Sequence, residues 1–234
     1  MRRSWFLLLL AGFVCMANAD SPVIHEVEPR QGPSDEDTIV TLNGDGFDIE
    51  SGVWLGRGGG MIPAGGCGTA GTGNAVVVGG DYAYVADGYR GLNVIDIQDP
   101  HNPVIVGLYD RPGAYGVATA GEFVYLASGY GGLQVIDVRY PALPALAGVL
   151  YTYTALDVVV AGNFAYVADS TGGLVVADVG DPASPVFAGV YDTPGCARAV
   201  DVAGGHAYVA DADHGLQIID ITDPFSPRFT GSYD

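Results

Sequence analysis

The sequence contains no lysine, and its nine basic residues, all arginine, stand against 27 Asp and Glu, giving a formal net charge of -18. A chain this acidic repels phosphate backbones, so DNA and RNA are excluded as partners. Cysteine is equally scarce: Cys67 and Cys196 are the only thiols outside the first nineteen residues. Two cysteines do not make a disulfide framework, and whether they pair stays open because spacing alone gives no Cα separation.

Long apolar runs and helical periodicity are missing too. No stretch beyond the N-terminus reaches the roughly 18 apolar residues that a membrane-spanning helix needs, and no Gly-x-Ser-x-Gly motif, phosphate loop or Cys-x-x-Cys pair occurs. The chain is instead 49% hydrophobic, with 36 glycines and 14 prolines. This composition excludes general disorder and favours short strands joined by turns.

Residues 1–19 have the pattern of a secretory signal peptide. Met1-Arg2-Arg3 is positively charged, an apolar run follows to Met16, and Ala17-Asn18-Ala19 is a small-x-small cleavage sequence. We therefore expect an exported protein, secreted or displayed at the cell surface, whose mature chain begins near Asp20.

The rest of the chain is dominated by an internal repeat. Tyr84, Tyr125, Tyr166 and Tyr208 are separated by 41, 41 and 42 residues, and each begins a string such as Tyr-Val-Ala-Asp. A second string keeps the same spacing and recurs at 91–96, 132–137, 173–178 and 215–220. Four units follow, at about 75–113, 114–154, 155–195 and 196–234.

Each unit divides into four short strands. In the second unit these are expected at Tyr115–Ala120, Phe123–Ala127, Leu133–Val138 and Ala145–Tyr151, because Gly, Asn, Asp and Pro cluster between them. Strands such as Leu174–Ala177 are apolar on both faces, which requires sheets stacked face to face. Four strands in a unit of about 42 residues predict an all-β fold, a β-propeller of four-stranded blades. Propellers span about four to eight blades, so a closed ring of four and an open arc both stay open.

The strings Leu92-Asn93-Val94-Ile95-Asp96 and Leu133 to Asp137 resemble the LVIVD repeat. The resemblance covers about 75–234, since the tyrosine, glycine, aspartate and proline positions recur in order. That family comprises bacterial and archaeal proteins expected to be β-propellers, often exported, without a settled biochemical activity. The resemblance therefore implies a fold and not a ligand.

The segment 20–56 differs from the repeats. The stretch from Pro22 to Pro29 is an expected alternating strand stopped by proline, and Thr38–Leu42 is a second, followed by Asn43-Gly44-Asp45-Gly46-Phe47. This pattern resembles the start of an IPT/TIG domain, an immunoglobulin-like module, but covers about half of one. The glycine-rich stretch 57–74 is expected to be a linker.

One end of the sheets is the expected binding face. In a four-stranded meander the second-to-third-strand turns and the links between blades lie at the same end, and these segments vary from unit to unit. Loops on a rigid scaffold are common binding sites. The expected contacts are Tyr89, Arg90, Tyr115, Tyr130 and His214. We expect a non-enzymatic binding or scaffolding module whose partner is an extracellular protein or carbohydrate.

The alternative is an extracellular hydrolytic or carbohydrate-active propeller. Asp157, Arg198 and Asp201 fall at the innermost strands, where two carboxylates beside an arginine are a candidate acid–base group. An ion pair or a solvated channel mouth is the preferred interpretation of these three residues.

The acidic residues also raise the question of metal. Asp211 and Asp213 have the spacing of calcium ligands but lack the remaining ligands of such a loop, so turn chemistry is preferred, no cofactor is expected, and calcium is the alternative. The recurring strand-end aspartates are expected to accept hydrogen bonds from turn amides; they are Asp96, Asp137, Asp178 and Asp220.

Overall fold

The computed structural model describes residues 23–28, 41–45 and 65–234, which fall in two units, 1–64 and 65–234. In the first unit, β1 (Val23–Glu28) pairs antiparallel with β2 (Thr41–Asp45). The second expected strand, Thr38–Leu42, overlaps β2 at Thr41 and Leu42, and its residues 38–40 lie outside the described residues. β2 continues through residues 43–45, which pair with β1. The expected signal peptide, residues 1–19, lies outside the described residues.

The second unit consists of four antiparallel sheets of four strands, and strand order in each sheet follows the chain. This arrangement fits a repeat β-propeller. The first sheet is β3 (Ala75–Gly79), β4 (Tyr82–Ala86), β5 (Leu92–Asp96) and β6 (Val104–Tyr109). The second is β7 (Gly116–Ala120), β8 (Phe123–Ala127), β9 (Leu133–Asp137) and β10 (Ala145–Leu150). The third is β11 (Asp157–Ala161), β12 (Phe164–Ala168), β13 (Leu174–Asp178) and β14 (Val186–Tyr191). The fourth is β15 (Ala199–Ala203), β16 (His206–Ala210), β17 (Leu216–Asp220) and β18 (Arg228–Tyr233). The strands expected for the second unit are confirmed to within one residue at each end.

Local chemistry ends the strands where the sequence predicts. The turns between the first and second strands contain Gly80, Gly121, Gly162 or Gly204, each with φ between 56° and 60°, a left-handed conformation that favours glycine. After the third strand, the strand-end aspartate accepts a hydrogen bond from the backbone N–H two residues later, at 2.9 Å for Asp178 and 3.0 Å for Asp137. The same bond forms at Asp96 and Asp220. The expected turn role of these four aspartates is confirmed.

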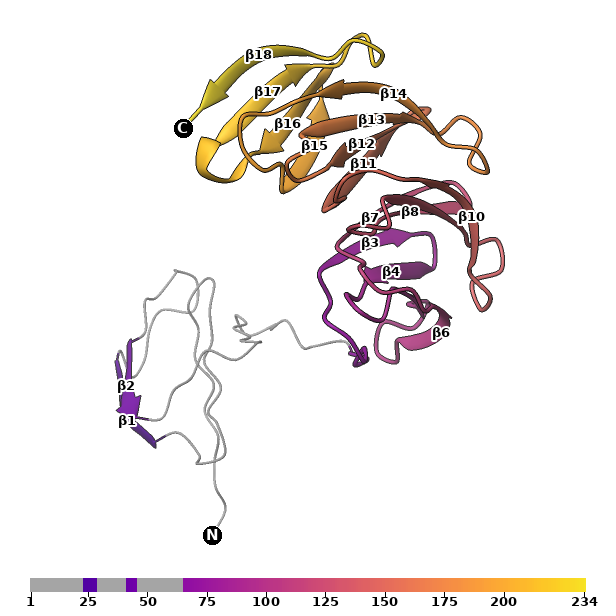
Figure 1. Cartoon of the computed structure of the whole chain (residues 1–234). Helices are drawn as coiled ribbons and strands as arrows, with labels where there is room; N and C mark the ends of the chain where they lie inside the picture. The colour runs from indigo at the N-terminus through magenta and orange to yellow at the C-terminus, as the bar shows by residue number, and fades with distance from the viewer. Residues whose placement is uncertain (1–22, 29–40, 46–64) are drawn as a thin grey trace. The chain divides into compact units, whose positions relative to one another are not determined.

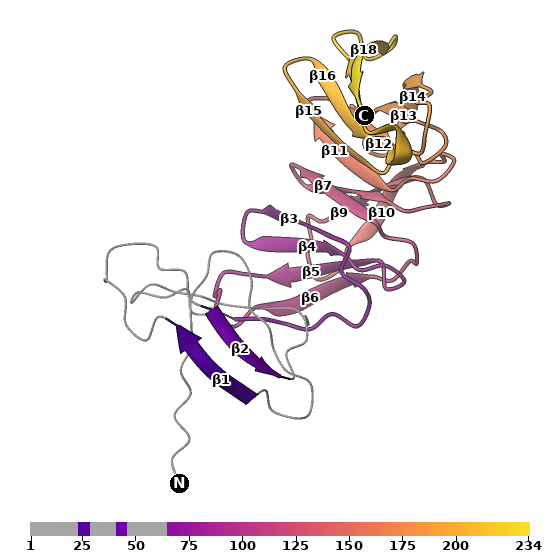
Figure 2. The ribbon, with the colours of Figure 1, turned by 90° about the vertical axis from the view of Figure 1, so that its left-hand side faces the viewer.

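The sheets stack face to face, each innermost strand packing on the next: β3 on β7, β7 on β11, and β11 on β15. Figures 1 and 2 show the four sheets following one another in an arc, with β3 and β18 toward its two ends. A separate apolar cluster fills each of the three spaces between sheets. Between the third and fourth sheets, for example, Tyr166, Leu174 and Val176 pack against Val200, Val209 and Ile219.

The outermost strands also touch. Each last strand carries a glycine at a β-bulge, where the two strands change register. A Cβ on that glycine would collide with backbone of the following sheet: Gly107 faces the carbonyl of Pro141, Gly148 that of Pro182, and Gly189 that of Pro224. Glycine is needed here because two backbones approach too closely for any side chain. This contact fixes the spacing of neighbouring sheets at their outer edges.

Residues 65–74 lie within the expected linker but contact the first sheet. A Cβ at Gly65 would collide with the carbonyl oxygens of Pro100 and His101, and Thr69 Oγ1 and Gly71 N–H both donate to Asp87. This part of the glycine-rich stretch therefore lies against the first sheet.

Candidate binding face

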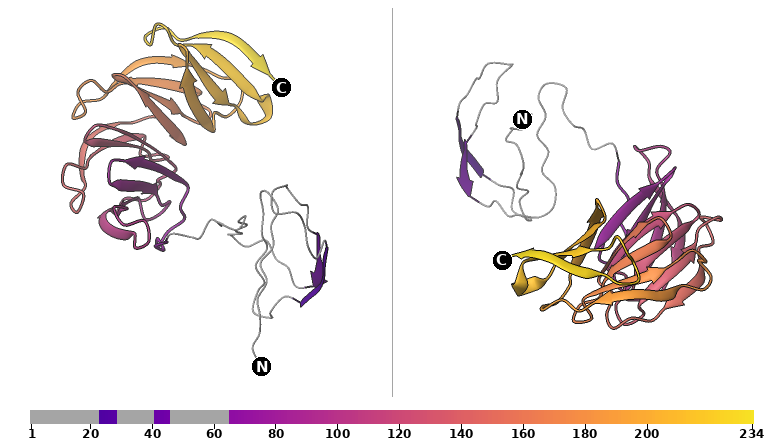
Figure 3. Two further views of the ribbon diagram at one scale, coloured as in Figure 1. Left: turned by 180° about the vertical axis from the view of Figure 1, so that it is seen from behind. Right: turned by 90° about the horizontal axis from the view of Figure 1, so that it is seen from above.

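The loops between second and third strands are joined to the links between sheets by a repeated pair of backbone hydrogen bonds. Gly129 N–H donates to Ala155 O at 2.8 Å, and Ala155 N–H returns a bond to Gly129 O at 3.0 Å. Gly88 pairs with Ala114 and Ser170 with Ala197 in the same way. The loop of one sheet is thus braced against the link that leads into the next sheet. We call this end of the stack the loop face; it consists of residues 87–91, 110–115, 128–132, 151–156, 169–173, 192–198 and 211–215. Figure 3 shows the four stacked sheets from behind and from above.

A buried aspartate anchors three of these loops. Asp169, 2% exposed, accepts hydrogen bonds from Thr152 Oγ1 (2.5 Å) and from the backbone N–H groups of Tyr153 (2.8 Å) and Thr154 (2.7 Å). Asp211 accepts from Thr193 Oγ1 (2.7 Å) and Gly195 N–H (2.8 Å). Asp87 makes the equivalent bonds with Thr69 and Gly71. Each carboxylate therefore ties its loop to the preceding link, and burial is compensated by full hydrogen bonding.

The second sheet departs from this scheme. Ser128 stands where the other sheets have aspartate, and Arg111 where they have threonine. Ser128 is 2% exposed, and its hydroxyl and the buried Gln134 Oε1 have no hydrogen-bond partner among the described residues. Two buried polar atoms near the loop that carries Tyr130 thus have no hydrogen-bond partner among the described residues.

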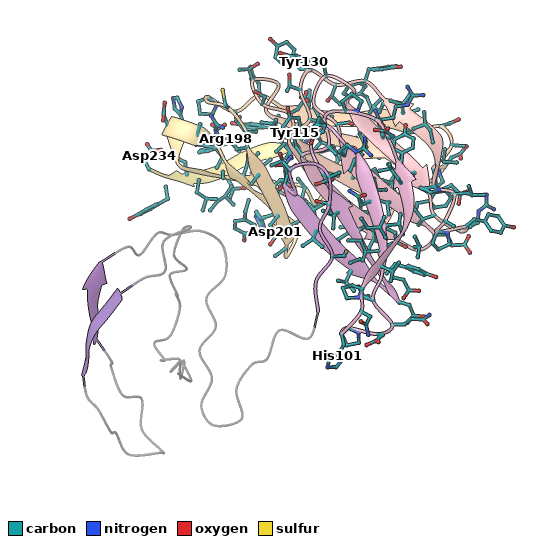
Figure 4. All side chains as sticks on the ribbon, turned by 90° about the horizontal axis from the view of Figure 1, so that it is seen from below. His101, Tyr115, Tyr130, Arg198, Asp201 and Asp234 are labelled. Atoms are coloured by element: carbon teal, nitrogen blue, oxygen red, sulfur yellow. The ribbon has the colours of Figure 1, made fainter. Side chains whose placement is uncertain are left out.

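Exposed tyrosines gather on the loop face. Tyr130 is 85% exposed and Tyr115 45%, and Figure 4 shows both on the same side of the sheets, opposite His101. Tyr89 is also exposed, with its hydroxyl donating to the Ala70 carbonyl. The link after β10 adds Tyr151 and Tyr153, 71% and 64% exposed. The sequence analysis missed these last two, although their position in a variable link was a signal that could have found them.

The other two expected contacts lie on the same face. Arg90 is 3.8 Å from Asp110, an exposed ion pair that contributes little to stability. His214 lies in the short 3-10 helix Ala212–His214 and lines a shallow, open groove of about 430 Å³. Its other lining residues are Tyr191, Asp192, Thr193, Pro194, Gln217, Phe229, Ser232 and Asp234.

The two carboxylates proposed for an enzymatic function, Asp157 and Asp201, differ in their contacts. Asp157 bridges two sheets, accepting from Val158 N–H (2.9 Å) and from Val200 N–H of β15 (3.0 Å). Burial raises the pKa of the Asp157 carboxyl, the two amides lower it, and nearby Asp201 raises it further. Arg198 lies at the loop face, whereas Asp201 lies further along β15 (Figure 4), and no ion pair joins them in the structure. Asp157 and Asp201 thus interact electrostatically.

The calcium alternative rests on Asp211 and Asp213. Asp211 directs both carboxylate oxygens to the link before β15, while Asp213 is exposed in the 3-10 helix. Within residues 23–28, 41–45 and 65–234, no group of three or more His, Cys, Asp or Glu side chains comes together as a metal site. The contacts of Asp211 are therefore those of turn chemistry.

The four-sheet repeat coincides with four matches to one family model. The model of the LVIVD repeat matches residues 70–111, 113–152, 154–193 and 194–234, one match for each sheet. The chain belongs to the LVIVD-repeat family. The LVIVD matches begin at residue 70, so the first includes part of the segment that packs on the first sheet.

Other comparisons address the N-terminus and the fold. A model of the IPT/TIG domain matches residues 22–90, overlapping the first LVIVD match, although β3 and β4 belong to the first sheet. The crystal structure of the computationally designed Ika4 protein aligns with a TM-score of 0.53 at 10% identity, over 64% of this chain and 92% of that chain. This likeness concerns the fold alone. A search of curated proteins found no match. In the described part of the chain, no helix is long and apolar enough to cross a membrane.

Proposed function

We propose that this LVIVD-repeat chain is exported and acts as a non-enzymatic binding or scaffolding module whose loop face recognises an extracellular protein or carbohydrate. The observation that carries the proposal is the set of five exposed tyrosines on one braced surface; they are Tyr89, Tyr115, Tyr130, Tyr151 and Tyr153. Tyrosine supplies large contact area at small conformational cost and carries a hydrogen-bonding hydroxyl, so it is enriched where proteins bind.

The second sheet is the proposed centre of the site. Its loop presents Tyr130 above the unsatisfied Ser128 hydroxyl, and Tyr115 lies directly beside that loop, with its ring against Gly129. Exposed aromatic area on a loop held by a rigid scaffold is common where proteins bind. The buried aspartate of the other three sheets is replaced by Ser128 in this sheet alone.

A double substitution tests the proposal. The full chain is screened against an array of defined oligosaccharides and a panel of extracellular proteins, and the strongest binder is titrated calorimetrically. Tyr115→Ala with Tyr130→Ala is expected to weaken it at least tenfold, the loss of one or two aromatic contacts. Tyr140→Ala is the control, because Tyr140 is 75% exposed in a turn at the opposite end of the sheets. Equal affinity of all three proteins would refute the proposal.

A hydrolytic function is the second candidate, favoured by one observation: Asp157 is a buried carboxyl with a raised pKa next to Asp201. Such a pair matches the requirement for a general acid. Asp157→Asn should then abolish turnover of a glycoside or ester substrate while the circular-dichroism spectrum of the folded chain is unchanged. Retained turnover would exclude this function.

A further inference from the structure

One face of the fourth sheet is not covered by any described residue. The repeat makes this visible, because each position has three counterparts. Tyr84, Tyr125 and Tyr166 are 3–5% exposed, whereas Tyr208 is 36% exposed. The same holds along the face: the counterparts of Leu216 and Ile218 are 0% exposed, but these two residues are half-buried, and Ala210 is exposed.

The three completed interfaces show what normally covers this face. Each is covered by the next sheet, which contributes a valine of its innermost strand and a proline turn at the bulge glycine. The valines are Val117, Val158 and Val200, 4–9% exposed, and the prolines are Pro141, Pro182 and Pro224. Gly231 is the bulge glycine of the fourth sheet, and a Cβ there would meet nothing within 4 Å. The position for a fifth proline turn is open.

The first sheet presents the other half of that interface. Val76, the counterpart of those three valines, is 64% exposed, and Val78 is 59% exposed. Its turn at Pro100 and His101 is in contact with Gly65. The two open faces are therefore complementary by construction, since the repeat joins the same pair of surfaces three times within the chain.

The spacing of the repeat shows which residues of the fourth sheet correspond to the segment before the first sheet. Gly65 lies 42 residues before Gly107 and occupies the place of a bulge glycine against the turn that contains Pro100. Gly231 is thus its counterpart, and Asp234 corresponds to Gly68. Thr69 and Gly71 bind Asp87 as Thr193 and Gly195 bind Asp211. Residues 231–234 therefore correspond in the repeat to residues 65–68, which lie against the first sheet.

We propose that two copies of this chain associate head to tail, the fourth sheet of each docking on the first sheet of the other. Gly231 of one copy takes the place of Gly65 of the other, so residues 65–68 are displaced while the bonds to Asp87 remain. The result is a ring of about eight sheets, within the range that propellers span, and a head-to-tail contact that closes after two copies leaves no sheet face open. Asp201 also lies on the open face of the fourth sheet, at the repeat position of Val159. Val159 is half-buried in the interface between the third and fourth sheets, so the Asp201 carboxylate would keep contact with water in the dimer.

The proposal is tested by measuring the mass of the full chain by light scattering on a sizing column. The measurement covers a hundredfold range of concentration. The expected mass at high concentration is two copies. Gly231→Ala is the decisive variant: nothing opposes a Cβ in the single chain, and its φ is not left-handed, but in the dimer the Cβ would strike the proline turn. We expect it to be monomeric with an unchanged circular-dichroism spectrum. Gly189→Ala, the same change inside the stack, should instead lower the melting temperature at every concentration.

Ile218→Asp provides a second, independent variant on the open face, and Val190→Asp, at a residue 58% exposed on β14, is its control. The proposal predicts a monomer for the first and a dimer for the second. A monomeric wild-type chain at all concentrations would overturn it, whether the face is then bare or covered by residues of the first unit. A dimer that survives both Gly231→Ala and Ile218→Asp would overturn it as well, because another surface would hold it.

Discussion

The buried aspartate of the loop face is the element whose energetic role the structure defines most sharply. In Asp169→Ala, three donors lose their acceptor: Thr152 Oγ1 and the N–H groups of Tyr153 and Thr154. Each bond to a carboxylate contributes about 1–1.5 kcal/mol net where its donor is partly exposed, so the variant should lose about 3–5 kcal/mol of unfolding free energy. For a domain of this size that corresponds to a fall in melting temperature of roughly 10 °C or more.

Ser128→Ala at the same repeat position is the matched comparison. The Ser128 hydroxyl is buried and has no partner among the described residues, so its removal should leave stability within about 0.5 kcal/mol of wild type or raise it. Urea unfolding of the full chain, followed by circular dichroism, measures both variants. If Asp169→Ala cost less than 1 kcal/mol, or if Ser128→Ala cost as much as Asp169→Ala, the assignment of the carboxylate as the tie between loop and link would be wrong.

Three further results are expected. Burial raises the pKa of Asp157 above the value of about 3.9 that an aspartate has in an unfolded chain. Above pH 4 the folded state therefore binds more protons than the unfolded state. The free energy of unfolding falls as the pH rises through the raised pKa and Asp157 ionises. Asp157→Asn should remove this loss, so its unfolding free energy relative to wild type should rise between pH 4 and 7; parallel curves would contradict the shift. Ala212 has a φ of 48°, a conformation in which the first two sheets place Gly88 and Gly129 and the third places Ser170. Ala212→Gly should therefore stabilise the chain by about 1 kcal/mol in a thermal melt, and a loss of stability would show that the strain is absent. EDTA should leave the melting temperature unchanged, since Asp211 is satisfied by Thr193 and Gly195; a fall reversed by calcium would restore the metal interpretation.

Strand positions could be predicted because their determinants are local. Glycine and aspartate between apolar runs fix the turns, and the four strand-end aspartates do bind the amide two residues ahead. The ties between sheets could not be predicted. Asp169 and Thr152 are 17 residues apart, and Asp157 and Val200 are 43 apart, so their pairing depends on how one sheet lies on the next. The same limit applies to Arg198 and Asp201, because neighbours in sequence on a strand need not meet in space.

The bulge-glycine contact has a consequence for how such chains change length. Because every junction within the chain uses the same parts, a proline turn on a glycine and a valine strand on a tyrosine face, a unit of 41 or 42 residues can be added to the stack by repeating one set of contacts. Each insertion adds one sheet and one junction, so stability accumulates unit by unit as in other repeat proteins. Gene duplication can therefore lengthen this protein in whole steps, while the tyrosines and loops of each unit diverge independently.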